Sequence, residues 1–130
     1  MSEEVLLVND IMAKDVITVN ANRPVSEVIK ILVEKDISGV VVADYVGDVV
    51  GMISAIDVFK VFNEEKNDKE FIAEDIMTPY AINIQPEMPA EDAARTMLEN
   101  GVHRLVVTMS PSKRKPIGII SSTDILRAFG

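Results

Sequence analysis

The chain repeats itself, and this internal repeat constrains the fold more than any other feature of the sequence. The triplet Asp-Ile-Met occupies residues 10–12 and again residues 75–77, at an offset of 65. After a two-residue insertion in the second copy the offset becomes 67, and residues 51–57 then correspond to residues 118–124. We therefore expect two copies of one structural motif. The predicted division is a first copy at 1–62, an acidic polar linker at 63–72 and a second copy at 73–130.

Each copy contains the same predicted elements in the same order. The first has strands at 16–19, 40–43 and 49–54, a helix after Pro24 and a helix at 56–62. The second has strands at 81–84, 105–109 and 117–121, a helix after Pro89 and a helix at 123–129. The order is β-α-β-β-α, twice. Because one copy is too small to bury much core, we expect an α+β pseudo-dimer in which the two sheets pack together with helices outside.

The helix after Pro24 and its counterpart after Pro89 each carry an apolar stripe at helical spacing. The stripe of the first helix consists of Val25, Val28, Ile29, Leu32 and Val33. That of the second consists of Ala90, Ala93, Ala94, Met97 and Leu98. Both are single apolar stripes on otherwise polar helices.

Composition excludes several classes of function. With 13 Lys and Arg against 21 Asp and Glu, the formal charge is −8, which disfavours nucleic acid and anionic membrane surfaces as partners. Cysteine is absent, so disulfides, thiol catalysis and most structural zinc sites are excluded. No apolar run approaches the roughly 18–20 residues needed to span a bilayer, and the acidic N-terminus does not resemble a signal peptide. We expect a cytoplasmic protein.

The motif Gly-x-x-Ser-x-x-Asp ends the last strand of each copy and begins the final helix. One interpretation is a capping box, in which the serine caps the helix and the aspartate reaches back to the serine N–H. The other is a ligand site, because a helix N-terminus attracts phosphate and a carboxylate can accept both hydrogen bonds from a ribose diol. The two interpretations are compatible.

The doubled β-α-β-β-α unit, with this motif leading into a helix, resembles a tandem cystathionine-β-synthase (CBS) domain pair. The resemblance covers roughly residues 8–62 and 73–130. It implies two motifs packed through their sheets as a pseudo-twofold module with two clefts. In that family adenine-containing ligands often occupy one or both clefts, and pairs of modules commonly join into a disc-shaped dimer.

The resemblance favours one cleft as the nucleotide site. Asp124 would hold the ribose, Ser121 and Thr123 would line the sugar and phosphate, and His103 and Arg104 would approach the phosphate. Backbone groups of the first copy would meet the adenine edge, with Gly39 allowing a close approach. The residues implied are Asp15, Val16, Ile17, Ile37, Ser38, Gly39, His103, Arg104, Ser121, Thr123 and Asp124. For His103, the only histidine, a solvent-facing position before a strand is the alternative.

The second cleft departs from this pattern. Ile56 stands where Thr123 supplies a hydroxyl, and Ser38-Gly39 stand where His103-Arg104 supply cationic groups. We therefore expect weaker binding there. The residues implied are Ser54, Asp57, Tyr80, Ala81, Ile82 and Val102.

These observations predict a non-catalytic regulatory module that binds an adenosine-containing ligand and signals by conformational or oligomeric change. AMP, ADP and ATP are the favoured ligands, with S-adenosylmethionine and NAD also open. The sequence lacks a Walker A motif, a Gly-x-Ser-x-Gly elbow and a second histidine for a metal cluster, so we expect no catalysis, no metal and no required cofactor. The expected partners are a second copy of the chain and a protein effector in trans. The alternative is a structural or dimerisation module that docks onto a partner protein without a ligand.

Overall fold

The computed structural model describes residues 5–63, 71–79 and 82–130. The chain divides into two compact units, Met1–Val16 with Ile82–Gly130 (unit 1) and Ile17–Ala81 (unit 2). The segment that leads into each sequence copy thus belongs to the unit formed by the other copy. Most of the linker predicted at 63–72 lies outside the described residues.

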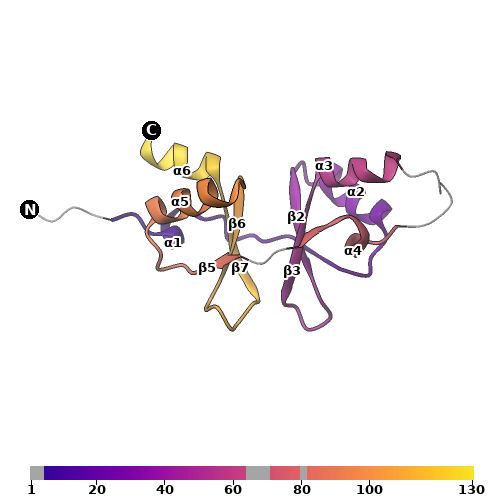
Figure 1. Cartoon of the computed structure of the whole chain (residues 1–130), viewed down its shortest axis with the longest axis horizontal. Helices are drawn as coiled ribbons and strands as arrows, with labels where there is room; N and C mark the ends of the chain where they lie inside the picture. Colours follow the sequence, from indigo (N-terminus) through magenta and orange to yellow (C-terminus); the bar gives the residue numbers. More distant parts are fainter. Residues whose placement is uncertain (1–4, 64–70, 80–81) are drawn as a thin grey trace, which may run out of the picture. The chain divides into compact units, whose positions relative to one another are not determined.

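Unit 2 is a four-stranded sheet with helices on one face (Figure 1). Its elements are β1 (Thr18–Asn20), α2 (Val25–Glu34), β2 (Gly39–Ala43), β3 (Val49–Ser54), α3 (Ala55–Val58), a 3-10 helix η1 (Phe59–Asn63), α4 (Ala73–Ile76) and β4 (Thr78–Pro79). The strand order is β1-β2-β3-β4. Strands β1 and β2 are parallel, whereas β2–β3 and β3–β4 are antiparallel.

Unit 1 repeats this plan with a three-stranded sheet, again with its helices on one face (Figure 1). Its elements are α1 (Val8–Ile11), β5 (Asn83–Ile84), α5 (Ala90–Asn100), β6 (Arg104–Thr108), β7 (Pro116–Ser121) and α6 (Ser122–Phe129). Ala13 forms an antiparallel bridge to Ile119 of β7, at the place where β4 pairs with β3 in unit 2. Helices α1, α5 and α6 contact one another. Within the described ranges no helix is long and apolar enough to cross a membrane.

The predicted order of elements and the α+β fold are confirmed, but three short elements were missed. Helices α1 and α4 are the first elements of the two repeats. They have four residues each, too few for a periodic pattern. Each is fixed by its aspartate, because Leu7 N–H donates to Asp10 Oδ2 and Ile72 N–H to Asp75 Oδ2, both at 2.9 Å. This capping explains why Asp-Ile-Met is repeated. The third missed element is β4.

The single helix predicted at 56–62 is wrong in its detail, because the chain forms α3 and then the 3-10 helix η1. Its counterpart α6 is one continuous helix of eight residues. The two repeats therefore differ at the helix that follows the Gly-x-x-Ser-x-x-Asp motif.

The apolar stripe of α2 is partly buried and partly exposed. Val25, Val28 and Leu32 are buried in the core of unit 2, but Ile29 and Val33 are exposed. Helix α5 divides in the same way, with Ala90, Ala93 and Met97 buried and Leu98 exposed. In both helices part of the apolar stripe therefore faces away from the core.

The motif glycines make room for the methionines of the lead segments. The three atoms nearest to a Cβ at Gly118 would all belong to the side chain of Met12. A Cβ at Gly51 would lie 2.5 Å from Met77 Sδ and also 2.8 Å from the backbone carbonyl oxygen of Thr78. Glycine is thus required where the lead segment of one repeat lies against the last strand of the other.

These contacts predict that Gly51→Ala destabilises the protein more than Gly118→Ala. Backbone must move at Gly51, which we expect to cost about 1–3 kcal/mol of unfolding free energy, as overpacking does elsewhere. At Gly118 the flexible thioether of Met12 can shift, and the loss stays below about 1 kcal/mol. Urea unfolding of the two variants checks this, and equal losses would contradict it.

Candidate functional site

The end of β7 and the start of α6 form a reciprocal capping box in unit 1. Ser121 N–H donates to Asp124 Oδ2 at 2.9 Å, and Asp124 N–H donates to Ser121 Oγ at 3.1 Å. The capping-box interpretation is therefore confirmed here. It fixes the Asp124 carboxylate in the first turn of an eight-residue helix, where the helix dipole favours negative charge.

The rest of the Asp124 carboxylate faces the surface. Its Oδ1 lies 3.7 Å from Arg127 Nη1, an ion pair longer than a hydrogen bond. The Asp124 side chain is 22% exposed and lines a surface pocket of about 230 Å³ with Ile11, Arg127 and Ala128. This arrangement offers a carboxylate oxygen, a cation and a helix N-terminus to one small ligand.

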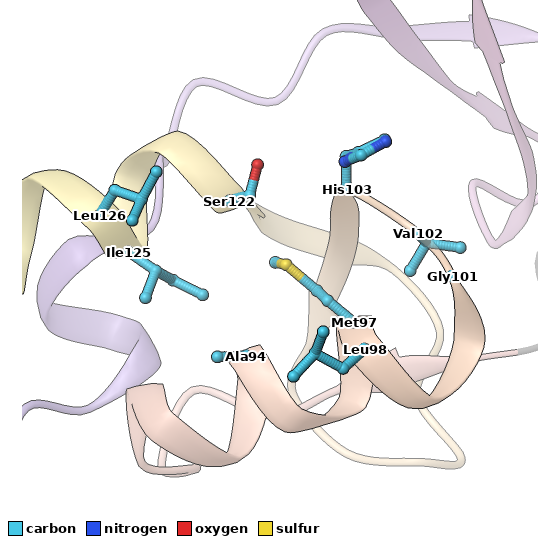
Figure 2. A pocket seen from close by; sticks show the side chains of 9 residues that line it. All are labelled: Ala94, Met97, Leu98, Gly101, Val102, His103, Ser122, Ile125 and Leu126. Carbon is cyan, nitrogen blue, oxygen red and sulfur yellow. The ribbon is translucent and has the colours of Figure 1, made fainter.

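His103 and Arg104 lie beside the same strand end as Asp124, but the His103 side chain borders a different pocket. Arg104 is the register partner of Ser121 across β6 and β7, and Ser122 N–H donates to the His103 carbonyl at 2.9 Å. The His103 side chain stands at the rim of a larger pocket of about 420 Å³ between α5 and α6 (Figure 2). In that pocket Met97 and Ile125 point toward each other, and Leu98 and Leu126 complete its apolar lining (Figure 2). Unit 1 thus places His103 and Asp124 at different pockets.

In unit 2 the equivalent carboxylate, Asp57, is buried and surrounded by donors. Its Oδ2 accepts from Ser54 N–H at 2.9 Å and from Ser54 Oγ at 3.2 Å. Its Oδ1 accepts from Thr78 Oγ1 at 3.1 Å and lies 3.0 Å from Lys60 Nζ. Lys60 Nζ also donates to the carbonyl of Ile76, the last residue of α4, at 3.1 Å.

These contacts set the charge state of Asp57. Burial alone would raise the pKa of its carboxyl, but the hydrogen bonds from Ser54, Lys60 and Thr78, together with the Lys60 charge, lower that pKa below its ordinary value. A carboxyl with a lowered pKa in the folded state adds stability above its unfolded pKa of about 3.9. That contribution is lost as the pH falls below this value through the folded pKa.

The other predicted site residues are divided between the two units. Those in unit 1 are Asp15, Val16, Ile82, Val102 and Thr123, and those in unit 2 are Ile17, Ile37, Ser38, Gly39 and Ser54. Asp15, Ser38 and Thr123 are exposed, whereas Ile37 packs against the core of unit 2. Tyr80 and Ala81 lie outside the described residues. The described part of the chain contains no group of three or more acidic or histidine side chains suited to a metal ion.

Sequence analysis missed Lys60, Thr78 and Arg127 as partners of the motif carboxylates. A signal was present, because at the offset of 67 a basic residue follows each motif aspartate by three positions, Lys60 in one copy and Arg127 in the other. Such spacing places the two side chains on the same face of a helix. Thr78 carried no comparable signal, since β4 was not predicted.

Comparison with known proteins places both units in one family. The family model for the CBS domain matches residues 8–64 and 73–130. The CBS domain pair of protein MJ0100, solved with 5′-methylthioadenosine and S-adenosyl-L-methionine, is 31% identical with a TM-score of 0.84, covering 98% of each chain. CBSX2, solved in complex with AMP, is 29% identical with a TM-score of 0.82, covering 95% of each chain.

A curated relative places the same region within a larger enzyme. The L-aspartate semialdehyde sulfurtransferase of Methanocaldococcus jannaschii is 31% identical over 130 residues, which are 100% of this chain and 24% of that protein. The chain therefore spans about a quarter of the length of this relative. The matched residues and the two sheet-and-helix units together show that the chain belongs to the CBS-domain family, as a tandem CBS pair.

Proposed function

We propose that this chain is a non-catalytic regulatory module that binds an adenosine-containing ligand. Two CBS pairs of similar sequence and fold were solved with such ligands, AMP in one and 5′-methylthioadenosine with S-adenosyl-L-methionine in the other. Adenosine is the chemistry that these ligands share. The observation that carries the proposal is the Asp124 carboxylate, held by Ser121 at the start of α6 and open to a surface pocket.

Each group at α6 has a chemical role in this proposal. The Asp124 carboxylate accepts hydrogen bonds from the two ribose hydroxyls. These hydrogen bonds are stronger than neutral ones because the carboxylate is charged. The N-terminus of α6, the Thr123 hydroxyl and the cationic side chains near it balance the negative charge of a phosphate group. In a protein of formal charge −8, such local groups are needed to attract an anionic nucleotide.

The ligand acts by shifting a conformational equilibrium. A nucleotide that binds one conformation better than another favours that conformation, up to the difference between its two affinities. We propose that an effector protein in trans reads the change. The catalytic activity of the larger sulfurtransferase is not assigned to this chain.

We further propose that the chain forms a homodimer through its exposed apolar helix faces. In unit 1 this face consists of Leu98, Leu126 and Phe129, which are 83%, 72% and 56% exposed. The equivalent positions in unit 2 are Val33, Phe59 and Phe62, which are 72%, 50% and 72% exposed. A twofold dimer requires a self-complementary surface. Because the chain is an internal repeat, each unit carries an equivalent exposed apolar helix face that can contribute to such a surface.

Thermal unfolding with AMP, ADP, ATP, NAD, S-adenosylmethionine and 5′-methylthioadenosine tests the proposed function. A ligand at about 100 times its dissociation constant adds roughly 2.7 kcal/mol of stability, which raises Tm by several degrees. We expect at least one of the six to do so, with the guanosine analogue GMP as the control. If none shifts the transition, the ligand proposal fails and the alternative of a ligand-free docking module takes its place.

A further inference from the structure

The buried carboxylate of Asp57 is the titratable group that the proposed function does not use. Its side chain is 11% exposed, half the exposure of the Asp124 side chain. Four protein donors surround it: the N–H and hydroxyl of Ser54, the hydroxyl of Thr78 and the ammonium of Lys60. A carboxylate has about four acceptor positions, so these donors take up its capacity.

We propose that Asp57, Lys60 and Thr78 form a polar lock that fastens the segment containing α4 and β4 onto the end of β3 and α3. Lys60 joins the two parts of the lock, because its ammonium contacts both Asp57 Oδ1 and the carbonyl of Ile76. The Ile76 carbonyl ends α4 and lacks a partner within that helix, which is where a cation stabilises a helix. Thr78, two residues later, donates to the same carboxylate oxygen at 3.1 Å.

Unit 1 contains the same positions without the lock. Arg127 corresponds to Lys60, and its Nη1 lies 3.7 Å from Asp124 Oδ1, against 3.0 Å for Lys60 Nζ and Asp57 Oδ1. Ala13 corresponds to Thr78, since each bridges the equivalent residue of the last strand, and alanine has no hydroxyl to donate. One chain therefore holds a locked and an open version of the same carboxylate.

The lock has a consequence for ligand number, which rests on the proposed function. A ribose diol needs acceptor positions that Asp57 has already given to Lys60 and Thr78. Asp124 retains them, so the chain has one carboxylate for a ribose and takes one adenosine ligand. The second, weaker cleft that the sequence predicts around Asp57 is in this view closed by the protein's own side chains.

Matched substitutions in the two units test the lock without any ligand. We expect Lys60→Met, Thr78→Val and Asp57→Asn each to lower Tm by about 4–8 °C, because each removes a hydrogen bond to a charged group that is partly buried. Arg127→Met, at the equivalent position of unit 1, should lower it by less than about 2 °C, since its ion pair is long and exposed. Equal losses for Lys60→Met and Arg127→Met would overturn the proposal. If Asp57→Asn does not fold, the Tm values of Lys60→Met and Thr78→Val still test the lock.

A transplant of the lock into unit 1 tests its effect on binding. The variant Ala13→Thr with Arg127→Lys should raise Tm and weaken AMP affinity at least 10-fold, because Asp124 then acquires the donors that Asp57 has. An unchanged Tm would overturn the lock. An unchanged affinity with a raised Tm would overturn its role in ligand number. If the wild-type chain binds none of the six adenosine compounds, the proposed function fails, whereas the Tm comparison of the matched substitutions tests the lock independently.

Discussion

Replacing Asp124 by alanine is expected to weaken the binding of the adenosine ligand at least 100-fold. The carboxylate would accept both ribose hydroxyls, and two charge-assisted hydrogen bonds together contribute about 3 kcal/mol or more, which corresponds to a factor of about 100 in the dissociation constant. Titration calorimetry with AMP on the wild-type and Asp124→Ala chains measures the effect.

The control for this experiment is Asp75→Ala. Asp75 has the same capping position in α4 that Asp124 has in α6, and it likewise accepts an N-cap N–H at 2.9 Å. Its removal lowers stability by about 1 kcal/mol through the lost cap, as Asp124→Ala also does. Affinity should remain at the wild-type value in Asp75→Ala. Similar losses in both variants would show that capping, and not ribose binding, explains the effect.

Replacing Leu126 by aspartate is expected to convert the proposed homodimer into a monomer. Leu126 is 72% exposed and borders the apolar pocket between α5 and α6, which Leu98 also lines (Figure 2). A carboxylate at the centre of a buried apolar interface has no partner there and costs at least about 3 kcal/mol, so the dimer dissociation constant rises roughly 100-fold. Sedimentation equilibrium or light scattering after gel filtration measures the mass.

Ser112→Asp serves as the control for this charge. It adds the same carboxylate to the exposed loop between β6 and β7, which the proposed interface does not include. We expect that variant to keep the wild-type mass. A wild-type chain that is monomeric at about 100 µM, or a Leu126→Asp variant that stays dimeric, would contradict the proposed interface.

Much of the fold followed from the repeat and from periodicity. Strand β3 was predicted at its observed bounds, and β6 and β7 within one residue, because β-branched runs bounded by turn residues are a strong local signal. The lead helices could not be predicted in this way. Four residues give no period, and what fixes α1 is a side-chain cap together with packing against α5 and α6, segments distant in sequence.

The candidate site was predictable in residue type but not in detail. The motif Gly-x-x-Ser-x-x-Asp identified the two carboxylates that the structure places at helix starts. The hydrogen bond from Thr78 to Asp57, which helps to distinguish the two, was not predictable, since Thr78 lies 21 residues along the chain on a strand that was not predicted. The position of His103 at the pocket between α5 and α6 likewise depends on tertiary packing, which a local pattern does not encode.

The most direct test of the account is calorimetric titration of the wild-type chain with AMP, S-adenosylmethionine and 5′-methylthioadenosine in turn. The account predicts that at least one of them binds saturably, with about one ligand per chain, as expected if Asp124 is open and Asp57 is locked. The absence of saturable binding by all three, to a chain whose circular dichroism shows it to be folded, would contradict the central claim. Two equal sites per chain would support an adenosine-binding module but contradict the role of the polar lock in limiting the chain to one ligand.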